Sequence, residues 1–128
     1  SIALAQLDKI DQLQARRETI WNFYQSEFTN NPNIITPQDA RDGEKHSYFT
    51  YCIKVNKRNE LARYLLEKNI YTTLRYHPLH FYPIYNQDNI KLTNTEILNK
   101  TALNIPLHPR LSDDDISYVV SAIKNFFK

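Results

Sequence analysis

The sequence contains very little glycine and very little cysteine. Gly43 is the only glycine among the 128 residues, so a glycine-rich loop that wraps a phosphate with backbone N–H groups is excluded from this chain. Cys52 is the only cysteine, and an internal disulfide therefore cannot form. A lone cysteine is typical of a protein from a reducing compartment, so we expect a cytoplasmic location.

Methionine is absent, and the chain starts at Ser1 inside a pattern that is typical of a helix. Because a natural chain starts with Met, we expect a fragment or a processed piece of a longer protein. No apolar run reaches membrane-spanning length, and the net charge of +2 is too small to indicate a nucleic-acid or membrane surface. We therefore expect neither nucleic acid nor a membrane as a partner.

Residues 2–28 carry apolar side chains at steps of three and four, which predicts one long helix. A helix of this length should extend beyond its own domain. We therefore expect its first turns to pack against a neighbouring domain that is missing here.

The rest of the pattern predicts an α+β fold, in which helices cover a small, mostly antiparallel sheet of about three strands. Alternating apolar residues predict a strand over 49–55, while 34–35 and the residues from Ile70 onward suggest shorter ones. A helix is expected between them, with Asn56 or Asn59 as its N-cap.

Three local signals mark helix ends in the second half of the chain. Asn69 is expected to end a helix in the left-handed conformation that Gly usually adopts there. Thr93 with Glu96 forms a capping-box pattern for a helix that runs to about residue 103. Ser112 with Asp115 forms a second one for the closing helix.

The stretch 70–85 contains more groups capable of chemistry than any other window of the sequence. It opens with β-branched and aromatic residues and then meets Pro78 and Pro83, which predicts a strand followed by an irregular loop. Such a loop is how a scaffold presents a binding site. Arg75 is the candidate of most interest, because a guanidinium binds phosphate or carboxylate with two bonds. A surface ion pair is the competing interpretation.

We expect no metal site in this chain. His77 and His80 are three residues apart, but Pro78 between them rules against the helix on which that spacing could hold a metal. A third ligand would have to come from His46, His108 or a distant carboxylate. The plainer interpretation is that both imidazoles cap loop carbonyls or pack on tyrosine rings.

No catalytic residue is assigned from the sequence either. Cys52 lies in a strand pattern with one apolar face, which favours an inert thiol over a nucleophile. Helix capping explains the acidic run at 113–115 more simply than a pair of catalytic carboxylates. Base stacking on the aromatic stretch is disfavoured, because Arg75 is its only cation.

Several motifs occur in order along nearly the whole chain, at 5–11, 16–18, 46–49, 69–72, 76–80, 95–96 and 105–112. This ordered set resembles the C-terminal domain of the DegT/DnrJ/StrS family of pyridoxal-phosphate sugar aminotransferases. The resemblance implies that residues 1–128 form the small domain of a fold type I aminotransferase. The missing N-terminal large domain would hold pyridoxal 5'-phosphate and the cofactor lysine.

Members of that family transfer an amino group from Glu or Gln to a keto sugar, which is usually nucleotide-linked. They are homodimers with active sites at the subunit interface. The resemblance therefore implies an intact enzyme of this kind and a fragment that is inactive on its own. It assigns no cofactor-binding residue within this chain.

The matching strand and loop of the family line the substrate side of the active site. Through this likeness Arg75, Tyr76, His77, His80 and His46 are expected to be substrate-binding residues. Many members have His where this chain has Arg75, which points to a different sugar or to an arginine that grips a substrate phosphate.

Two alternatives stay open at this point. One is a stand-alone domain that binds a sugar or a partner protein through the aromatic loop, without a cofactor. The other is a relative that uses the same cofactor to dehydrate a sugar.

Overall fold

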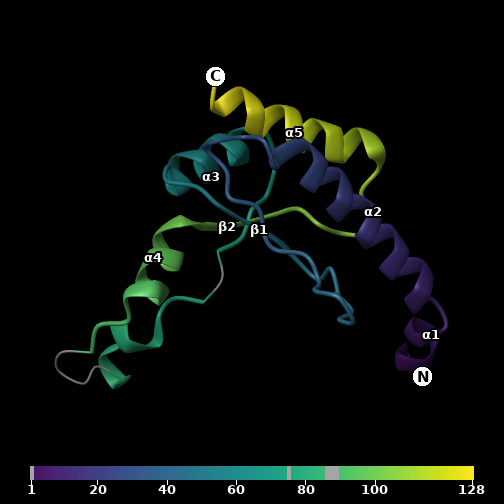
Figure 1. Cartoon of the computed structure of the whole chain (residues 1–128), viewed down its shortest axis with the longest axis horizontal. Coiled ribbons are helices and arrows are strands. Elements are labelled where there is room, and N and C mark those ends of the chain that lie inside the picture. The colour runs from purple at the N-terminus through teal and green to yellow at the C-terminus, as the bar shows by residue number, and fades with distance from the viewer. Residues whose placement is uncertain (1, 75, 86–89) are drawn as a thin grey trace.

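A computed structural model of the chain describes residues 2–74, 76–85 and 90–128. The elements in chain order are α1 (Ile2–Leu7), α2 (Ile10–Phe28), β1 (Tyr51–Lys54), α3 (Arg58–Glu67), the 3-10 turns η1 (Leu79–Phe81) and η2 (Pro83–Tyr85), α4 (Thr93–Thr101), β2 (Ala102–Ile105) and α5 (Asp113–Phe126). The predicted α+β class is confirmed. Two arms extend from the centre, one ending in α1 and the other formed by η1, η2 and α4 (Figure 1).

The sheet is small and antiparallel, as predicted, with β1 and β2 paired along their full lengths and Ile53 opposite Leu103. A single backbone bridge adds Ile35 to the outer edge of β1, and another adds Thr73 to the outer edge of β2. The segments expected as short strands at 34–35 and after Ile70 therefore reach the sheet only through these bridges.

The second strand lies where the sequence predicted the end of a helix. β2 follows α4 directly, with Ala102 already in an extended conformation at φ −77° and ψ 133°. Three consecutive residues of β2 are buried, so no alternation marks it as a strand. This prediction was wrong because a strand covered on both faces lacks the period of two on which the expectation depended.

The core lies where α2, α3 and α5 meet the sheet. Most of α5's buried face follows the spacing expected from the sequence, and β1 contributes the alternating side chains of the predicted strand. The largest fully buried side chains are Trp21, Tyr24, Tyr51, Phe28, Ile20, Ile53, Leu61, Leu65, Leu103 and Ile123. Each such side chain contributes about 1.5–3 kcal/mol through the area it removes from water.

The single long helix predicted over 2–28 is divided into α1 and α2. The break lies at Asp8 and Lys9, where the Lys9 N–H donates to the Gln6 carbonyl at 3.2 Å and tightens the last turn of α1. All side chains of residues 3–10 are exposed, so no packing in this chain holds the two parts in one straight helix.

The predicted helix ends have mixed outcomes. Asn69 has φ +60°, which confirms the left-handed conformation. The N-cap of α3 is Lys57, whose side chain makes no capping hydrogen bond. The predicted N-cap at Asn56 or Asn59 is therefore wrong. Leu92, rather than Thr93, is the N-cap of α4, and Glu96 accepts the Leu92 N–H instead of the Thr93 N–H, so the expected capping box is wrong.

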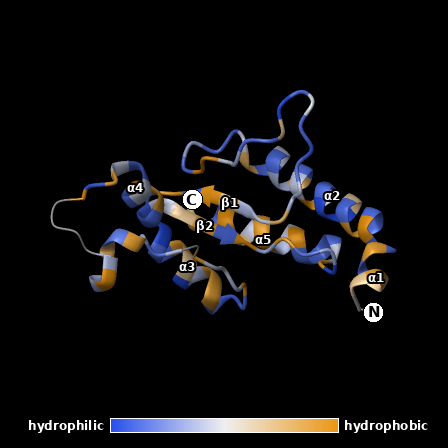
Figure 2. Cartoon of the chain, turned by 90° about the horizontal axis from the view of Figure 1, so that it is seen from below, coloured by the Kyte–Doolittle hydropathy of each residue, from blue (hydrophilic) through white to orange (hydrophobic). Residues whose placement is uncertain are grey.

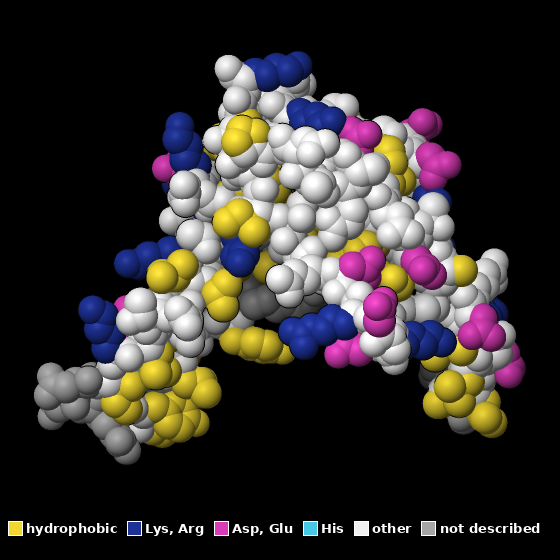
Figure 3. All heavy atoms as spheres, in the orientation of Figure 1, with side chains coloured by type: hydrophobic (Ala, Val, Ile, Leu, Met, Phe, Trp, Pro, Cys, Tyr) yellow, Lys and Arg dark blue, Asp and Glu magenta, His cyan; other side chains and the backbone are white. Residues whose placement is uncertain are grey.

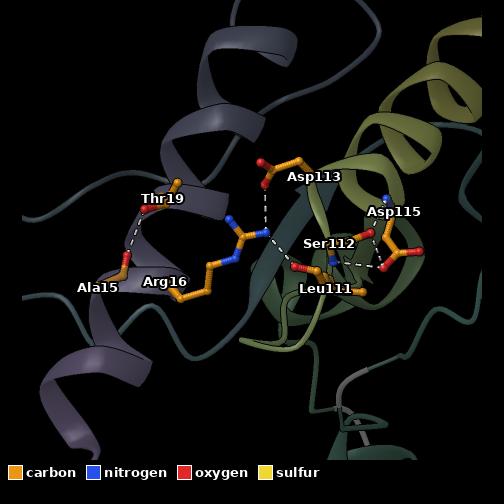
Figure 4. A network of polar contacts seen from close by, with 7 residues as sticks. All are labelled: Ala15, Arg16, Thr19, Leu111, Ser112, Asp113 and Asp115. Atoms are coloured by element: carbon orange, nitrogen blue, oxygen red, sulfur yellow. Dashed lines mark hydrogen bonds and ion pairs between the residues drawn. The ribbon is translucent and has the colours of Figure 1, made fainter.

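The start of α5 is fixed by the predicted capping box and by an arginine from α2 (Figure 4). The Asp115 N–H donates to Ser112 Oγ at 3.1 Å, and the Ser112 N–H donates to Asp115 Oδ2 at 2.9 Å. Arg16 Nη2 lies 2.5 Å from the Leu111 carbonyl oxygen and 2.9 Å from Asp113 Oδ1. One guanidinium thus joins the middle of α2 to the first turn of α5.

We expect acid to weaken this junction through Asp115. The two bonds that its carboxylate accepts from Ser112 hold the pKa of Asp115 below its usual value of 3.8. Because the folded pKa is the lower one, its stabilising contribution is present above pH 3.8 and is lost as the pH falls through the folded value. The melting temperature of Asp115→Asn should therefore fall less between pH 5 and pH 2.5 than that of the parent chain. An identical fall would contradict this role.

Hydrophobic residues continue from the centre into α1 at one end of the molecule and into the segment around η1 at the other (Figure 2). These are short stretches. Among residues 2–74, 76–85 and 90–128, no helix has the length and apolar character needed to cross a bilayer.

Candidate functional site

The segment 76–85 is irregular, as its prolines predicted. Pro78 precedes η1 with φ −55°, and its carbonyl accepts the Phe81 N–H at 3.0 Å. The Leu79 carbonyl accepts the Tyr82 N–H at 3.0 Å, and the second turn, η2, begins at Pro83. Proline suits the first position of such turns because its φ is already restricted and its missing N–H is not needed. Two short turns in series thus present the aromatic and imidazole side chains.

His77 is exposed at the start of this segment. Its ring lies 5.5 Å from the ring of Phe81 and meets the ring of Tyr82 edge-on at 5.2 Å, measured between centroids. Two aromatic rings therefore contact the imidazole, one tilted and one edge-on. This arrangement limits the ring orientation and leaves the imidazole open to a ligand.

His80 has a different environment from His77. Only 6% of its side chain is exposed, and its Nε2 lies 3.3 Å from Glu96 Oε1 on α4. Its ring also packs on Phe81 at 4.3 Å between centroids. The second ring nitrogen, Nδ1, is buried and has no hydrogen-bond partner. His80 is thus directed toward α4 and not toward the open surface.

Tyr76 is 87% exposed and borders a cavity of about 290 Å³ between the sheet, α3 and α4. The other residues that line this cavity are Cys52, Arg58, Thr95, Leu98, Asn99 and Ala102. Arg75, which the sequence singled out, lies outside the described residues. The structure thus brings Tyr76, His77 and His80 into one arm, in which His80 contacts Glu96 of α4 and Tyr76 borders a cavity lined by α4.

Arg58 is buried at 8% exposure beside this cavity, and it is a residue that the sequence analysis missed. Its Nη2 donates to the Asn99 carbonyl at 2.7 Å, and its Nη1 donates to the Ala102 carbonyl at 3.2 Å. Its Nε donates to Asn59 Oδ1 at 2.7 Å. The guanidinium therefore donates to carbonyls at the C-terminal end of α4, where the last carbonyls of a helix lack N–H donors within the helix.

His46 belongs to the other arm. Its ring contacts those of Trp21, at 4.5 Å, and Tyr48, at 4.7 Å between centroids, and its Nδ1 accepts the Tyr48 N–H at 2.8 Å. This bond requires a lone pair on Nδ1. Tyr48 has φ +46°, a left-handed conformation that is uncommon for a bulky residue. His46 also borders a cavity of about 340 Å³ along α2, separate from the one at Tyr76.

The clearest pKa shifts among buried groups belong to core tyrosines and not to these candidates. Burial raises the pKa of Tyr24 and of Tyr51 far above the usual value of 10. The Tyr24 hydroxyl donates to the Pro106 carbonyl at 2.9 Å, whereas the Tyr51 hydroxyl is buried without a partner. Tyr24 belongs to α2 and the Tyr51 ring packs against it at 5.1 Å between centroids, so these shifts reflect a dry core and not a reactive site.

A pyridoxal-phosphate site needs an enclosed lysine and backbone groups that surround a phosphate. Every lysine of the chain lies in the described part, and none is buried. The single glycine, Gly43, has no atoms near the position that a side chain would take. The residues described here therefore do not fit the cofactor by themselves. The same residues contain no group of three His, Cys, Asp or Glu side chains that could hold a metal ion.

Comparison with known proteins gives the family. The model of the DegT/DnrJ/EryC1/StrS aminotransferase family matches residues 1–124. The spore coat polysaccharide biosynthesis protein SpsC of Bacillus subtilis is 32% identical over 100% of this chain and 36% of its own length. The dTDP-4-dehydro-2,3,6-trideoxy-D-glucose 4-aminotransferase of Saccharopolyspora spinosa is 33% identical over 93% of this chain and 31% of its own length.

The solved structures agree with this assignment. The crystal structure of the aminotransferase TlmJ from Streptoalloteichus hindustanus superposes with a TM-score of 0.94 at 28% identity, over 98% of this chain and 35% of that one. The chain thus spans about a third of the length of the relatives that it matches. It belongs to the DegT/DnrJ/EryC1/StrS aminotransferase family.

Proposed function

We propose that residues 1–128 are the C-terminal small domain of a pyridoxal-phosphate-dependent aminotransferase. The intact enzyme, a cytoplasmic homodimer in this proposal, would transfer an amino group from Glu or Gln to a nucleotide-linked keto sugar. One observation carries the proposal: nearly the whole chain matches about a third of the S. spinosa dTDP-sugar 4-aminotransferase and about a third of the aminotransferase TlmJ. The S. spinosa relative, named for a dTDP-linked sugar, supports the nucleotide-linked substrate.

In this proposal the cofactor is bound by the part of the intact protein outside this chain, and it supplies the electron sink for amino transfer. The chain itself contributes to the substrate side. The exposed imidazole of His77 and the phenol of Tyr76 would contact the sugar nucleotide, with Arg75 as the cation expected from the sequence. His80 belongs to the same segment, and His46 would serve from the other arm.

Exposed apolar side chains on α1 and the start of α2 support the proposal that a further domain packs against this arm. Leu4, Leu7 and Ile10 are 62%, 60% and 52% exposed, and Phe49 beside them is 61% exposed. Leu7, Ile10 and Phe49 line a cavity of about 630 Å³ along α1 and α2, at one of the two ends where apolar side chains gather (Figure 3). Apolar surface of this kind is typical of an interface. We propose that it packs against the N-terminal part of the intact enzyme, and that the chain alone is inactive.

The cofactor assignment is tested on the full product of the natural gene. Its visible absorbance should change on addition of pyridoxal phosphate, and borohydride reduction should leave a cofactor-sized mass on a lysine upstream of residue 1. A full product that shows neither signal would overturn the aminotransferase proposal.

The substrate role of this arm is tested by His77→Ala in the intact enzyme. We expect the half-reaction with the keto sugar to slow about tenfold or more, since one hydrogen bond to a charged or polar substrate group is lost. The half-reaction with the amino donor should be unchanged. His108→Ala, which removes an exposed imidazole elsewhere, serves as the control. Equal losses in both half-reactions would contradict a role limited to the sugar.

A further inference from the structure

We propose that Glu96 and His80 are positioning residues that together set the orientation of His77. This inference rests on the proposed substrate role of His77. It gives the buried His80 a task other than sugar contact, and it gives Glu96 one beyond capping its own helix.

Glu96 joins two parts of the arm through one oxygen atom. Its Oε1 lies 3.3 Å from His80 Nε2 and accepts the Leu92 N–H at 3.2 Å. The first bond reaches η1, and the second reaches the N-terminus of α4. Only 23% of the Glu96 side chain and 6% of the His80 side chain are exposed, so water competes weakly for the contact between them. η1 is therefore tied to the first turn of α4.

From His80 the contact continues through aromatic rings to His77. The His80 and Phe81 rings lie 4.3 Å apart, and the Phe81 and His77 rings lie 5.5 Å apart. The Tyr82 ring also contacts the His77 ring, at 5.2 Å between centroids. Within the described residues, these two rings are the only aromatic rings that His77 contacts. A displacement of His80 would thus displace the support of the exposed imidazole.

In this proposal the contact between His80 and Glu96 is a hydrogen bond, with Nε2–H as the donor and the Glu96 side-chain oxygen as the acceptor. An amide oxygen in place of the carboxylate keeps an acceptor at the same position and should preserve the contact.

The first test measures positioning without any substrate. Hydrogen exchange in the intact protein is followed on peptides that cover 79–85, where the η1 and η2 turns hold the Phe81, Tyr82 and Tyr85 N–H groups. We expect Glu96→Ala and His80→Phe each to raise the exchange roughly five- to tenfold, as for the loss of one hydrogen bond. Glu96→Gln should exchange like the parent, and Glu67→Ala, an exposed glutamate of α3, is the matched control.

His80→Phe also separates the two roles of Glu96. It removes the Nε2 bond, keeps a ring against Phe81, and leaves the bond from Leu92 N–H to Glu96 intact. If Glu96 only caps α4, then His80→Phe leaves exchange at 79–85 unchanged, and the proposed positioning is overturned. Equal exchange in Glu96→Ala and the parent would overturn it as well.

The second test is kinetic and links the pair to His77. In the intact enzyme, Glu96→Ala should raise KM for the keto sugar several-fold, with a smaller effect on kcat and no change in the amino-donor half-reaction. In a His77→Ala background the same substitution should add no further loss. An additional, independent loss there would show that Glu96 does not act through His77. If exchange changes as expected while both substitutions leave the sugar reaction unaffected, the segment is positioned by the pair but the proposed substrate role of His77 is wrong.

Discussion

Replacing Trp21 with alanine should destabilise the chain by about 3–5 kcal/mol, the range for an aromatic side chain removed from a packed core. Trp21 is 1% exposed, and its ring contacts those of His46, Tyr48 and Tyr51 at 4.5, 5.3 and 4.8 Å between centroids. It therefore joins α2 to both β1 and the segment that carries His46. The free energy of unfolding in urea measures the loss.

The control for this substitution is Tyr71→Ala. Tyr71 is also aromatic, but it is 73% exposed, so its loss should change stability by no more than about 0.5 kcal/mol. Trp21→Phe keeps part of the ring stack and should fall between the two variants. If Trp21→Ala unfolds at the same urea concentration as Tyr71→Ala, the packing of α2 on the sheet is not as described.

The loss of the Arg58 guanidinium should cost roughly 2–4 kcal/mol, because two part-buried carbonyls at the end of α4 lose a charged donor. Arg58 is the only residue of α3 that binds the Asn99 and Ala102 carbonyls among the contacts of the described chain. These two carbonyls lie where α4 becomes β2. Arg58→Ala should therefore lower the melting temperature and raise amide exchange in 97–105.

Two further variants test whether the loss of stability is specific to the Arg58 guanidinium. Arg63→Ala removes an exposed arginine from the same helix and should be nearly neutral. Arg58→Lys keeps the charge but not the planar fork that reaches two carbonyls at once, so it should recover only part of the stability. Full recovery by lysine would show that charge alone, and not the paired geometry, stabilises this junction.

Part of the candidate site could be predicted from the sequence. The prolines at 78 and 83 predicted the irregular segment, and the motif at 76–80 is one of the ordered set that resembles the aminotransferases. Neither pattern indicated that His77 is exposed and contacts the Phe81 and Tyr82 rings, while His80 is buried against Glu96. Sequence spacing placed the two imidazoles together because they are three residues apart. Their environments differ because His77 precedes the 3-10 turn η1, whereas His80 lies within that turn and contacts Glu96 of α4.

The sequence by itself determined the features that depend on neighbouring residues. The capping box of Ser112 with Asp115 and the left-handed Asn69 each arise from bonds or sterics within a few residues, so the local pattern was sufficient. The family assignment is of the same kind, because it depends on motifs in order along the chain.

Only the tertiary structure decided the features that depend on distant contacts. β2 is a strand because β1 pairs with it, and its own residues carry no alternation. The break between α1 and α2 falls where packing against the core is absent. Arg58 and Glu96 acquire their roles from partners 41 and 16 residues away, respectively. Such contacts form only when the chain has collapsed around its core, so no local sequence pattern predicts them.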